Sequence, residues 1–354
     1  MRPFRCGTCD QLVYFENSAC LHCGSALGYR PEVRELVTVA LDGDQLVPRD
    51  GTTGPLSRCA NAAVANCNWL VSAAPGDGGL ELCPSCRLTT VRPSDDDLTA
   101  MAAFARAEAA KRRLIHQLTG LGLPIVDRAE DPEHGLAFEL LSSRGRPVTT
   151  GHERGVITLD LSESDDAHRA FVRQQLGEAY RTVLGHLRHE IGHYYWPRLV
   201  VEAGTLDEFR RLFGDETVDY QQALANHYAT IGAENHDRWS ATPVSQYATM
   251  HPWEDWAETF AHYLHIQDGL ETAAAFGLVV GEPARSVGAT AWTTGDGPIE
   301  ELSIGPMIGR WLGLTLALNG MSRSIGEGDH YPFVLSPTVI DKLDFVHQAV
   351  LAQG

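Results

Sequence analysis

The sequence lacks a long uninterrupted run of apolar residues. Its nearest approach extends from Pro306 to Met321 and is interrupted by Arg310 and Asn319, whereas roughly 20 consecutive apolar residues are needed to cross a bilayer. The first residues also lack the apolar stretch of a secretory signal. These two absences predict a soluble protein, and we take the cytoplasm as its expected location.

Positive charge is scarce as well. The 354 residues include 28 lysines and arginines against 46 aspartates and glutamates, which gives a formal net charge of -18 at pH 7. A chain of this sign repels the phosphates of nucleic acids and of anionic lipids rather than steering them to its surface. The composition therefore argues against a nucleic-acid partner and predicts no membrane partner.

Cysteine is absent from the chain after Cys86, and all eight cysteines lie between Cys6 and that residue. Six of them form three CxxC pairs. In a chain without an export signal, this spacing favours reduced thiolates that bind metal over disulfides. We therefore divide the sequence into a cysteine-rich N-terminal region, residues 1–93, and a second domain, residues 94–354.

The first four cysteines have the spacing of a zinc ribbon. They form the pairs Cys6-Gly-Thr-Cys9 and Cys20-Leu-His-Cys23, and each pair lets a tight turn present two sulfur atoms to one metal ion. A segment this short buries too little apolar surface to fold alone, so the metal would supply its stability. His22 could replace one sulfur ligand, although we expect it to face solvent.

The last four cysteines predict a second zinc site with less regular spacing. Only Cys83 and Cys86 have the CxxC pattern, while Cys59 and Cys67 stand further apart. The alternative is one metal-binding pair beside two buried structural cysteines. We expect two structural zinc ions in this region, one for each set of four cysteines.

Residues 94–354 predict a mainly helical domain with a small β-sheet, so the whole chain is expected to be an α+β protein. Acidic residues at 95–97 suit the start of a helix that extends to about residue 121. Short apolar runs predict strands at 137–141 and 156–161. Further helices are predicted at 166–177, 178–196, 206–212, 218–230, 253–266, 269–276, 299–320 and 337–351.

The motif His189-Glu-Ile-Gly-His193 lies within the predicted helix at 178–196. Two histidines four residues apart lie on the same helix face, where both imidazoles can bind one zinc ion. Glu190 then projects toward the open coordination position and can take a proton from zinc-bound water. The alternative is a surface helix with ordinary histidines, but apolar residues on the same helix favour a buried position.

A catalytic zinc ion keeps three protein ligands and one position for water, so the motif predicts a third ligand elsewhere. The best candidate is Glu254, which follows Pro252 and shares a helix face with Glu258 four residues later. Glu258 would then accept the free N–H of a ligand histidine. The reverse assignment stays open, because spacing cannot distinguish a ligand from its hydrogen-bonding partner.

These motifs together resemble those of a known family. The segment from residue 189 to 266 looks like the glutamate-zincin metallopeptidases, and it is similar in detail to the bacterial zinc-binding metallopeptidases with an N-terminal zinc ribbon. The residues that carry the resemblance are the paired CxxC motifs, 188–196 (RHEIGHYYW), 213–215 (FGD), 247–248 (YA) and 254–258 (EDWAE). The resemblance implies a zincin fold and hydrolysis of a peptide or protein, and it identifies no particular substrate.

The pair of catalytic helices also resembles the peptidase domain of anthrax lethal factor, in which a tyrosine seven residues before the glutamate ligand assists the transition state. Tyr247 stands at this offset from Glu254 and is our candidate to stabilise the oxyanion. Tyr220, Tyr228 and His236 are alternatives for this role. Packing in the core is the alternative for Tyr247 itself.

The expected reaction is zinc-dependent hydrolysis of a peptide bond, with zinc-bound water as the nucleophile and Glu190 as the general base. The run at 156–159 could form an edge strand that pairs with an extended substrate, although an ordinary buried strand would have the same pattern, and the zinc ribbons could dock a protein. Two other interpretations stay open. One is a ribbon module that binds proteins or nucleic acids beside a non-catalytic scaffold, and the other is hydrolysis of a different bond.

Overall fold

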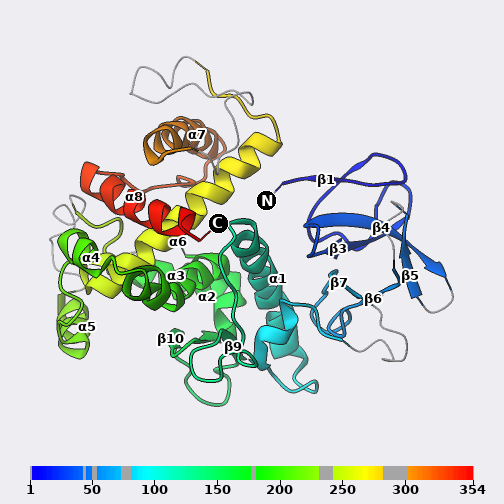
Figure 1. Ribbon diagram of the computed structural model, residues 1–354, viewed down its shortest axis with the longest axis horizontal. Coiled ribbons are helices and arrows are strands. Elements are labelled where there is room, and N and C mark those ends of the chain that lie inside the picture. The colour runs from blue at the N-terminus through cyan, green and yellow to red at the C-terminus, as the bar shows by residue number, and fades with distance from the viewer. Residues whose placement is uncertain are drawn as a thin grey trace. The chain divides into compact units, whose positions relative to one another are not determined.

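The computed structural model describes residues 2–42, 45–49, 54–72, 81–176, 181–230, 242–281 and 302–353. The chain divides into two compact units (Figure 1). Unit 1 contains residues 1–120 and 124–169, and unit 2 contains residues 121–123 and 170–354. The long helix and the first strands that follow residue 93 therefore belong to unit 1, and the boundary between residues 93 and 94 stays a prediction from composition.

A five-stranded antiparallel sheet forms most of the cysteine-rich part of unit 1, with its strands in sequence order. Its strands are β3 (Ala26–Arg30), β4 (Glu35–Asp42), β5 (Gln45–Pro48), β6 (Leu56–Arg58) and β7 (Leu70–Ser72). Buried side chains hold these strands together, namely those of Val37, Val39, Leu46, Leu56 and Leu70. Two shorter strands, β1 (Phe4–Arg5) and β2 (Leu12–Val13), pair separately on either side of the first CxxC turn.

A second sheet of unit 1 has the strand order β10-β11-β9-β8. Its strands are β8 (Thr89–Val91), β9 (Ala137–Leu141), β10 (Gly151–Glu153) and β11 (Val156–Asp160). Of the two alternatives for residues 156–159, the edge strand is wrong and the buried strand is present, because β11 pairs with β10 on one side and with β9 on the other. Ile157 and Leu159 are fully buried, so the run is apolar because it is central.

Helix α1 (Leu98–Gly120) is the long helix of unit 1. It begins after Asp97, whose Oδ1 accepts a hydrogen bond from the backbone N–H of Ala100 at 3.0 Å. The helix buries Glu108 and Lys111 completely, and these two residues form an ion pair of 2.6 Å. Pairing of this kind is what permits charged side chains inside a protein.

The described residues of unit 2 are mainly helical. Its helices are α3 (Val183–Trp196), α4 (Leu206–Phe213), α5 (Tyr220–Thr230), α6 (Pro252–Ala275), α7 (Ile304–Ser324) and α8 (Pro337–Leu351), and α2 (Asp166–Leu176) precedes them. A π-helical turn (Pro197–Glu202) follows α3, and a short turn, η5 (Tyr247–Thr249), precedes α6. The predicted α+β class is confirmed. Among the described helices, none is long and apolar enough to cross a bilayer.

Helix α6 continues through a position where the sequence predicted a break. We expected separate helices at 253–266 and 269–276, but α6 is continuous as far as Ala275. At Gly269, the ring of Trp311 occupies the space of a side chain, since its Cζ3 lies 2.6 Å from the position that a Cβ would take. The glycine therefore admits an aromatic contact and does not end the helix.

Helices α3 and α6 pack against each other (Figure 1). Gly192 lies at this contact, because a Cβ there would stand 3.0 Å from Ala257 Cα and 3.2 Å from Phe260 Cβ. Trp256 Nε1 also donates a hydrogen bond to the carbonyl oxygen of Gly192 at 2.8 Å. The glycine within the histidine motif thus permits the close approach of the two helices.

Replacing Gly192 with leucine should force α3 and α6 apart. Overpacking of a close contact costs roughly 1–3 kcal/mol, so we expect a lower melting temperature in thermal denaturation followed by circular dichroism. Gly320→Leu in α7 is the matched control, because nothing lies within 4 Å of the Cβ position of that exposed glycine. Equal melting temperatures for the two variants would contradict the packing role of Gly192.

Candidate functional site

Three groups of side chains bring potential metal ligands together. In each group, every residue offers one donor atom that lies within 4.8 Å of the donors of the other members. The groups are Cys6, Cys9, Cys20 and Cys23; Cys59, Cys67, Cys83 and Cys86; and His189, His193 and Glu254. All of these residues are candidate ligands in the sequence.

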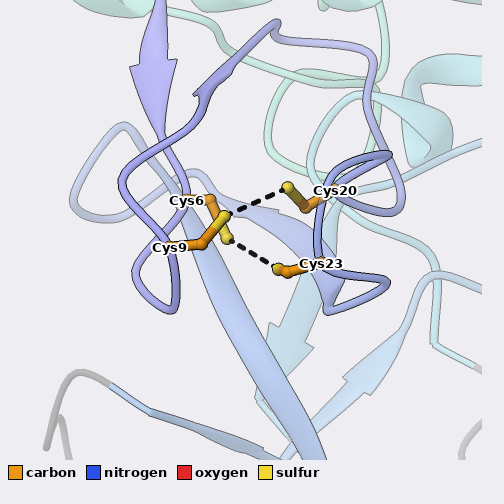
Figure 2. Close-up of side chains that lie close together, drawn as sticks. All are labelled: Cys6, Cys9, Cys20 and Cys23. Atoms are coloured by element: carbon orange, nitrogen blue, oxygen red, sulfur yellow. Dashed lines mark hydrogen bonds between the residues drawn. The ribbon is translucent and has the colours of Figure 1, made fainter.

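In the first cysteine cluster, the two CxxC turns face each other (Figure 2). Cys6 Sγ lies 3.7 Å from Cys23 Sγ, and Cys9 Sγ lies 3.7 Å from Cys20 Sγ. Sulfur atoms bound to one tetrahedral zinc ion at about 2.3 Å are separated by about 3.8 Å, so the spacing fits a single zinc ion. His22 is exposed, as expected for a histidine that faces solvent.

The second cluster consists of four buried cysteines with free thiols. Cys67 Sγ lies 3.7 Å from Cys83 Sγ, which is the spacing of the first cluster and far exceeds the roughly 2.05 Å of a disulfide bond. The backbone N–H of Cys83 donates to Cys59 Sγ at 3.3 Å, and that of Cys86 donates to Cys83 Sγ at 3.4 Å. Such donors favour the thiolate form that binds metal.

Helix α1 supports the second cluster with buried charge. Glu108 Oε2 lies 3.5 Å from Cys86 Sγ, and Lys111 Nζ donates to Glu108 Oε1 at 2.6 Å. Arg112 Nη2 donates to the carbonyl oxygen of Ala65 at 3.1 Å. These two buried cations offset negative charge that four thiolates and a carboxylate would otherwise bring into the interior.

The third group joins α3 to α6. His189 Nε2 lies 3.0 Å from Glu254 Oε2 and 3.2 Å from His193 Nε2, and His193 Nε2 lies 3.4 Å from the same carboxylate oxygen. Nitrogen and oxygen ligands bound to a tetrahedral zinc ion at about 2.0–2.1 Å are separated by about 3.3–3.4 Å. The three donor atoms therefore fit one zinc ion, which would keep one further coordination position.

Glu258 contacts the other nitrogen of His189. Its Oε1 lies 2.7 Å from His189 Nδ1, so when a metal binds Nε2, the remaining ring proton would lie on Nδ1 and point to Glu258. Its Oε2 accepts a hydrogen bond from Ser245 Oγ at 2.6 Å. Because Glu254 faces Nε2 and Glu258 faces Nδ1, this geometry favours Glu254 as the ligand and Glu258 as its supporting acceptor.

Glu190 lies beside the first histidine in α3 and is buried. Burial raises the pKa of its carboxyl group above the ordinary value, and positive charge at His189 and His193 opposes that shift. A carboxylate with a raised pKa holds a proton more readily near neutral pH, which suits a general base.

Two tyrosines lie next to the third group. The Tyr220 hydroxyl donates to Glu254 Oε1 at 2.8 Å, and the ring centroid of Tyr247 lies 5.8 Å from that of His189. Tyr247 is only partly buried, so it is not confined to the core. Outside the described residues lie two other candidates from the sequence, the side chain of Tyr228 and all of His236.

Neither Ser245 nor His227 was predicted from the sequence, yet both lie in this region. Ser245 contacts Glu258 as described above, and the ring of His227 lies 5.6 Å from the ring of Tyr247. Ser245 lies in an irregular segment whose path depends on the tertiary fold, whereas His227 lies two turns after Tyr220 in α5, a spacing that could have indicated it. A pocket of about 420 Å³ also lies here and is lined by Val218, Asp219, Gln222, Ala223, Asn226, His227, Thr249 and Met250.

Comparisons with known proteins identify a family for each part of the chain. Residues 100–349 match the family described as "Putative zinc-binding metallo-peptidase", and residues 3–97 match a family described as "zinc-ribbon domain". The chain is 50% identical over 356 residues to uncharacterized proteins of Mycobacterium bovis and Mycobacterium tuberculosis, with 99% of this chain and 95% of each relative covered. No solved structure matches the chain.

Changing one cysteine of each cluster to serine should separate the two sulfur sites. Cys9→Ser and Cys67→Ser should each lower the zinc content by about one ion per chain, because an oxygen binds zinc less well than a thiolate. Cys67→Ser should also lower the melting temperature more, since its cluster is wholly buried against α1. Elemental analysis beside the wild-type chain measures the first effect, and an unchanged zinc content in Cys67→Ser would contradict a second site.

Proposed function

The chain belongs to the zinc-binding metallo-peptidase family, and on that premise we propose that it hydrolyses peptide bonds at a single catalytic zinc ion. The observation that carries this proposal is the approach of His189 Nε2, His193 Nε2 and Glu254 Oε2 to within 3.0–3.4 Å of one another. A buried glutamate, Glu190, stands beside the first of them. A peptide or protein is therefore the proposed substrate.

Three side chains would hold the catalytic ion, namely those of His189, His193 and Glu254. Two imidazoles and one carboxylate are a donor set typical of catalytic zinc, whereas four cysteines are typical of structural zinc. We therefore propose one catalytic ion in unit 2 and two structural ions in unit 1. When bound, a catalytic zinc ion polarises a carbonyl group and makes water more acidic.

Glu190 is the proposed general base. Its carboxylate accepts a proton from the water molecule that attacks the carbonyl carbon, and it later delivers this proton to the nitrogen of the breaking C–N bond. Burial raises the pKa of this carboxyl group, which suits it to hold the proton between the two steps.

Glu258 and Tyr220 are proposed to orient the ligands. Glu258 accepts the Nδ1–H of His189, which turns Nε2 toward the other two ligands. The Tyr220 hydroxyl occupies Oε1 of Glu254 and leaves Oε2 to face the imidazoles. The ligand atoms of His189 and Glu254 are thus each directed by a hydrogen bond to the other polar atom of the same group.

Tyr247 is proposed to stabilise the oxyanion that forms on the scissile carbonyl group. Its ring packs beside that of His189, whereas the hydroxyl of Tyr220 is already directed at Glu254. His227, which lines the pocket described above, also packs against the Tyr247 ring. A substrate side chain in this pocket would bring its peptide group close to Tyr247.

Glu190→Gln should keep its zinc and lose hydrolysis. The amide has nearly the same shape as the carboxylate but cannot accept the proton, so we expect kcat to fall by about 10²–10⁴-fold. The assay digests a peptide library and identifies the products by mass spectrometry, with zinc measured on the same samples.

Two control variants accompany Glu190→Gln. Glu254→Ala should lose both zinc and hydrolysis, because it removes a ligand. Glu327→Gln makes the same chemical change as Glu190→Gln at an exposed position and should keep both. Hydrolysis by Glu190→Gln at the wild-type rate would exclude the proposed general base.

Tyr247→Phe and Tyr220→Phe should have different effects. Removal of one oxyanion donor lowers kcat by about 10²–10³-fold, and we expect this loss in Tyr247→Phe without a change in zinc affinity. Tyr220→Phe should weaken zinc binding, because Glu254 loses the hydrogen bond that directs it. The opposite pattern would move the oxyanion role to Tyr220.

A further inference from the structure

The Ser245 hydroxyl connects two parts of the proposed active site. Ser245 is buried in the segment that leads into η5. Its Oγ donates a hydrogen bond to Glu258 Oε2 at 2.6 Å and accepts one from the backbone N–H of Ala248 at 3.1 Å. One side chain therefore contacts both the carboxylate that orients His189 and the turn that contains Tyr247.

We infer that Ser245 is a positioning residue, which acts on His189 through Glu258 and on Tyr247 through the turn η5. The inference rests on the proposed function, because it assigns a role within the same metal centre. Ser245 contacts Glu258 rather than a ligand atom, so its effect on a metal is indirect.

The contact with Glu258 fixes the orientation of a carboxylate. Oε1 accepts the Nδ1–H of His189, and Oε2 accepts the hydroxyl of Ser245. With both oxygens engaged, the carboxylate cannot rotate without breaking a hydrogen bond. Loss of the serine hydroxyl leaves Oε2 without this donor, and the Nδ1 contact that aligns His189 becomes less well defined.

The second hydrogen bond of the Ser245 hydroxyl, with the backbone N–H of Ala248, restrains the turn η5. Ala248 and Tyr247 are consecutive residues of η5, so the hydrogen bond to the Ala248 N–H limits movement of the Tyr247 backbone. Ser245 therefore links Glu258, which supports the ligand His189, to Tyr247, the proposed oxyanion donor. A single substitution at this position should affect both.

A second set of hydrogen bonds holds the segment around Ser245 against α6. The serine can therefore be substituted without releasing the segment. Lys342 Nζ donates to the carbonyl oxygen of Thr242 at 2.9 Å and to Asp255 Oδ2 at 2.5 Å. This buried lysine of α8 holds the beginning of the segment against α6 without any contribution from the serine hydroxyl. We therefore expect Ser245→Ala to fold.

The first experiment measures metal affinity in the full-length chain. Protein that keeps its cysteine-bound zinc is depleted of the histidine-bound ion with a weak chelator and titrated with Co²⁺, whose visible spectrum reports ligand geometry. We expect Ser245→Ala to bind Co²⁺ about 10-fold more weakly and with an altered spectrum, since supporting hydrogen bonds to metal ligands are worth about 10–100-fold in affinity.

Two comparison variants define the cause of this loss. Ser245→Thr keeps the hydroxyl and should restore the affinity and the spectrum. Ser164→Ala removes the hydroxyl of another buried serine, in unit 1, and should change neither. The melting temperature of each metal-depleted variant shows whether a weaker affinity follows from a general loss of stability.

A double-mutant cycle tests the route through Glu258. If Ser245 acts on the metal through this carboxylate, Ser245→Ala should cause no further loss of Co²⁺ affinity in a Glu258→Ala background. Wild-type affinity in Ser245→Ala, or an undiminished loss in that background, would overturn the inference. Activity of Glu190→Gln decides the proposed function separately, because the cobalt titration needs no turnover.

Discussion

The close contact of α3 and α6 at Gly192 is the constraint on which the candidate active site depends. Helix α3 carries both imidazoles, whereas α6 carries Glu254, so the separation of the helices sets the distance between nitrogen and oxygen ligands. The absence of a side chain at Gly192 permits this separation, because Ala257 Cα lies only 3.0 Å from the position of its missing Cβ. The hydrogen bond from Trp256 to the Gly192 carbonyl oxygen then fixes the register of the two helices.

The charges around the site, like the distances between its ligand atoms, are suited to a bound cation. Glu190, Glu254 and Glu258 bring three carboxyl groups around the imidazoles, and burial alone raises the pKa of each. Hydrogen bonds from His189 reverse that shift for two of them, lowering the pKa of Glu254 and bringing that of Glu258 to about 2. Ionised carboxylates at a buried site need compensating positive charge, which protonated imidazoles supply here and which a bound cation would supply in their place.

The features that could be predicted from the sequence are those set by local geometry. Histidines four residues apart on a helix and cysteines in a CxxC turn must lie together, whatever the rest of the chain does. The choice between an edge strand and a buried strand at 156–159 could not be made from the sequence, because an apolar run does not show whether a strand is central and β10 has almost no apolar residues. The break predicted between residues 266 and 269 failed for a similar reason, since only the tertiary fold brings Trp311 to Gly269.

The contacts of Tyr220 and Ser245 with the site were not predictable from spacing, but they follow from a requirement on the two carboxylates of α6. Glu254 and Glu258 each direct one oxygen at His189, so each needs a hydrogen-bond donor for the second oxygen when it leaves water. Tyr220 supplies the donor for Glu254, and Ser245 supplies it for Glu258. Both donors are hydroxyl groups, which add no charge of their own, so the imidazoles and a bound cation remain the partners of the two negative charges.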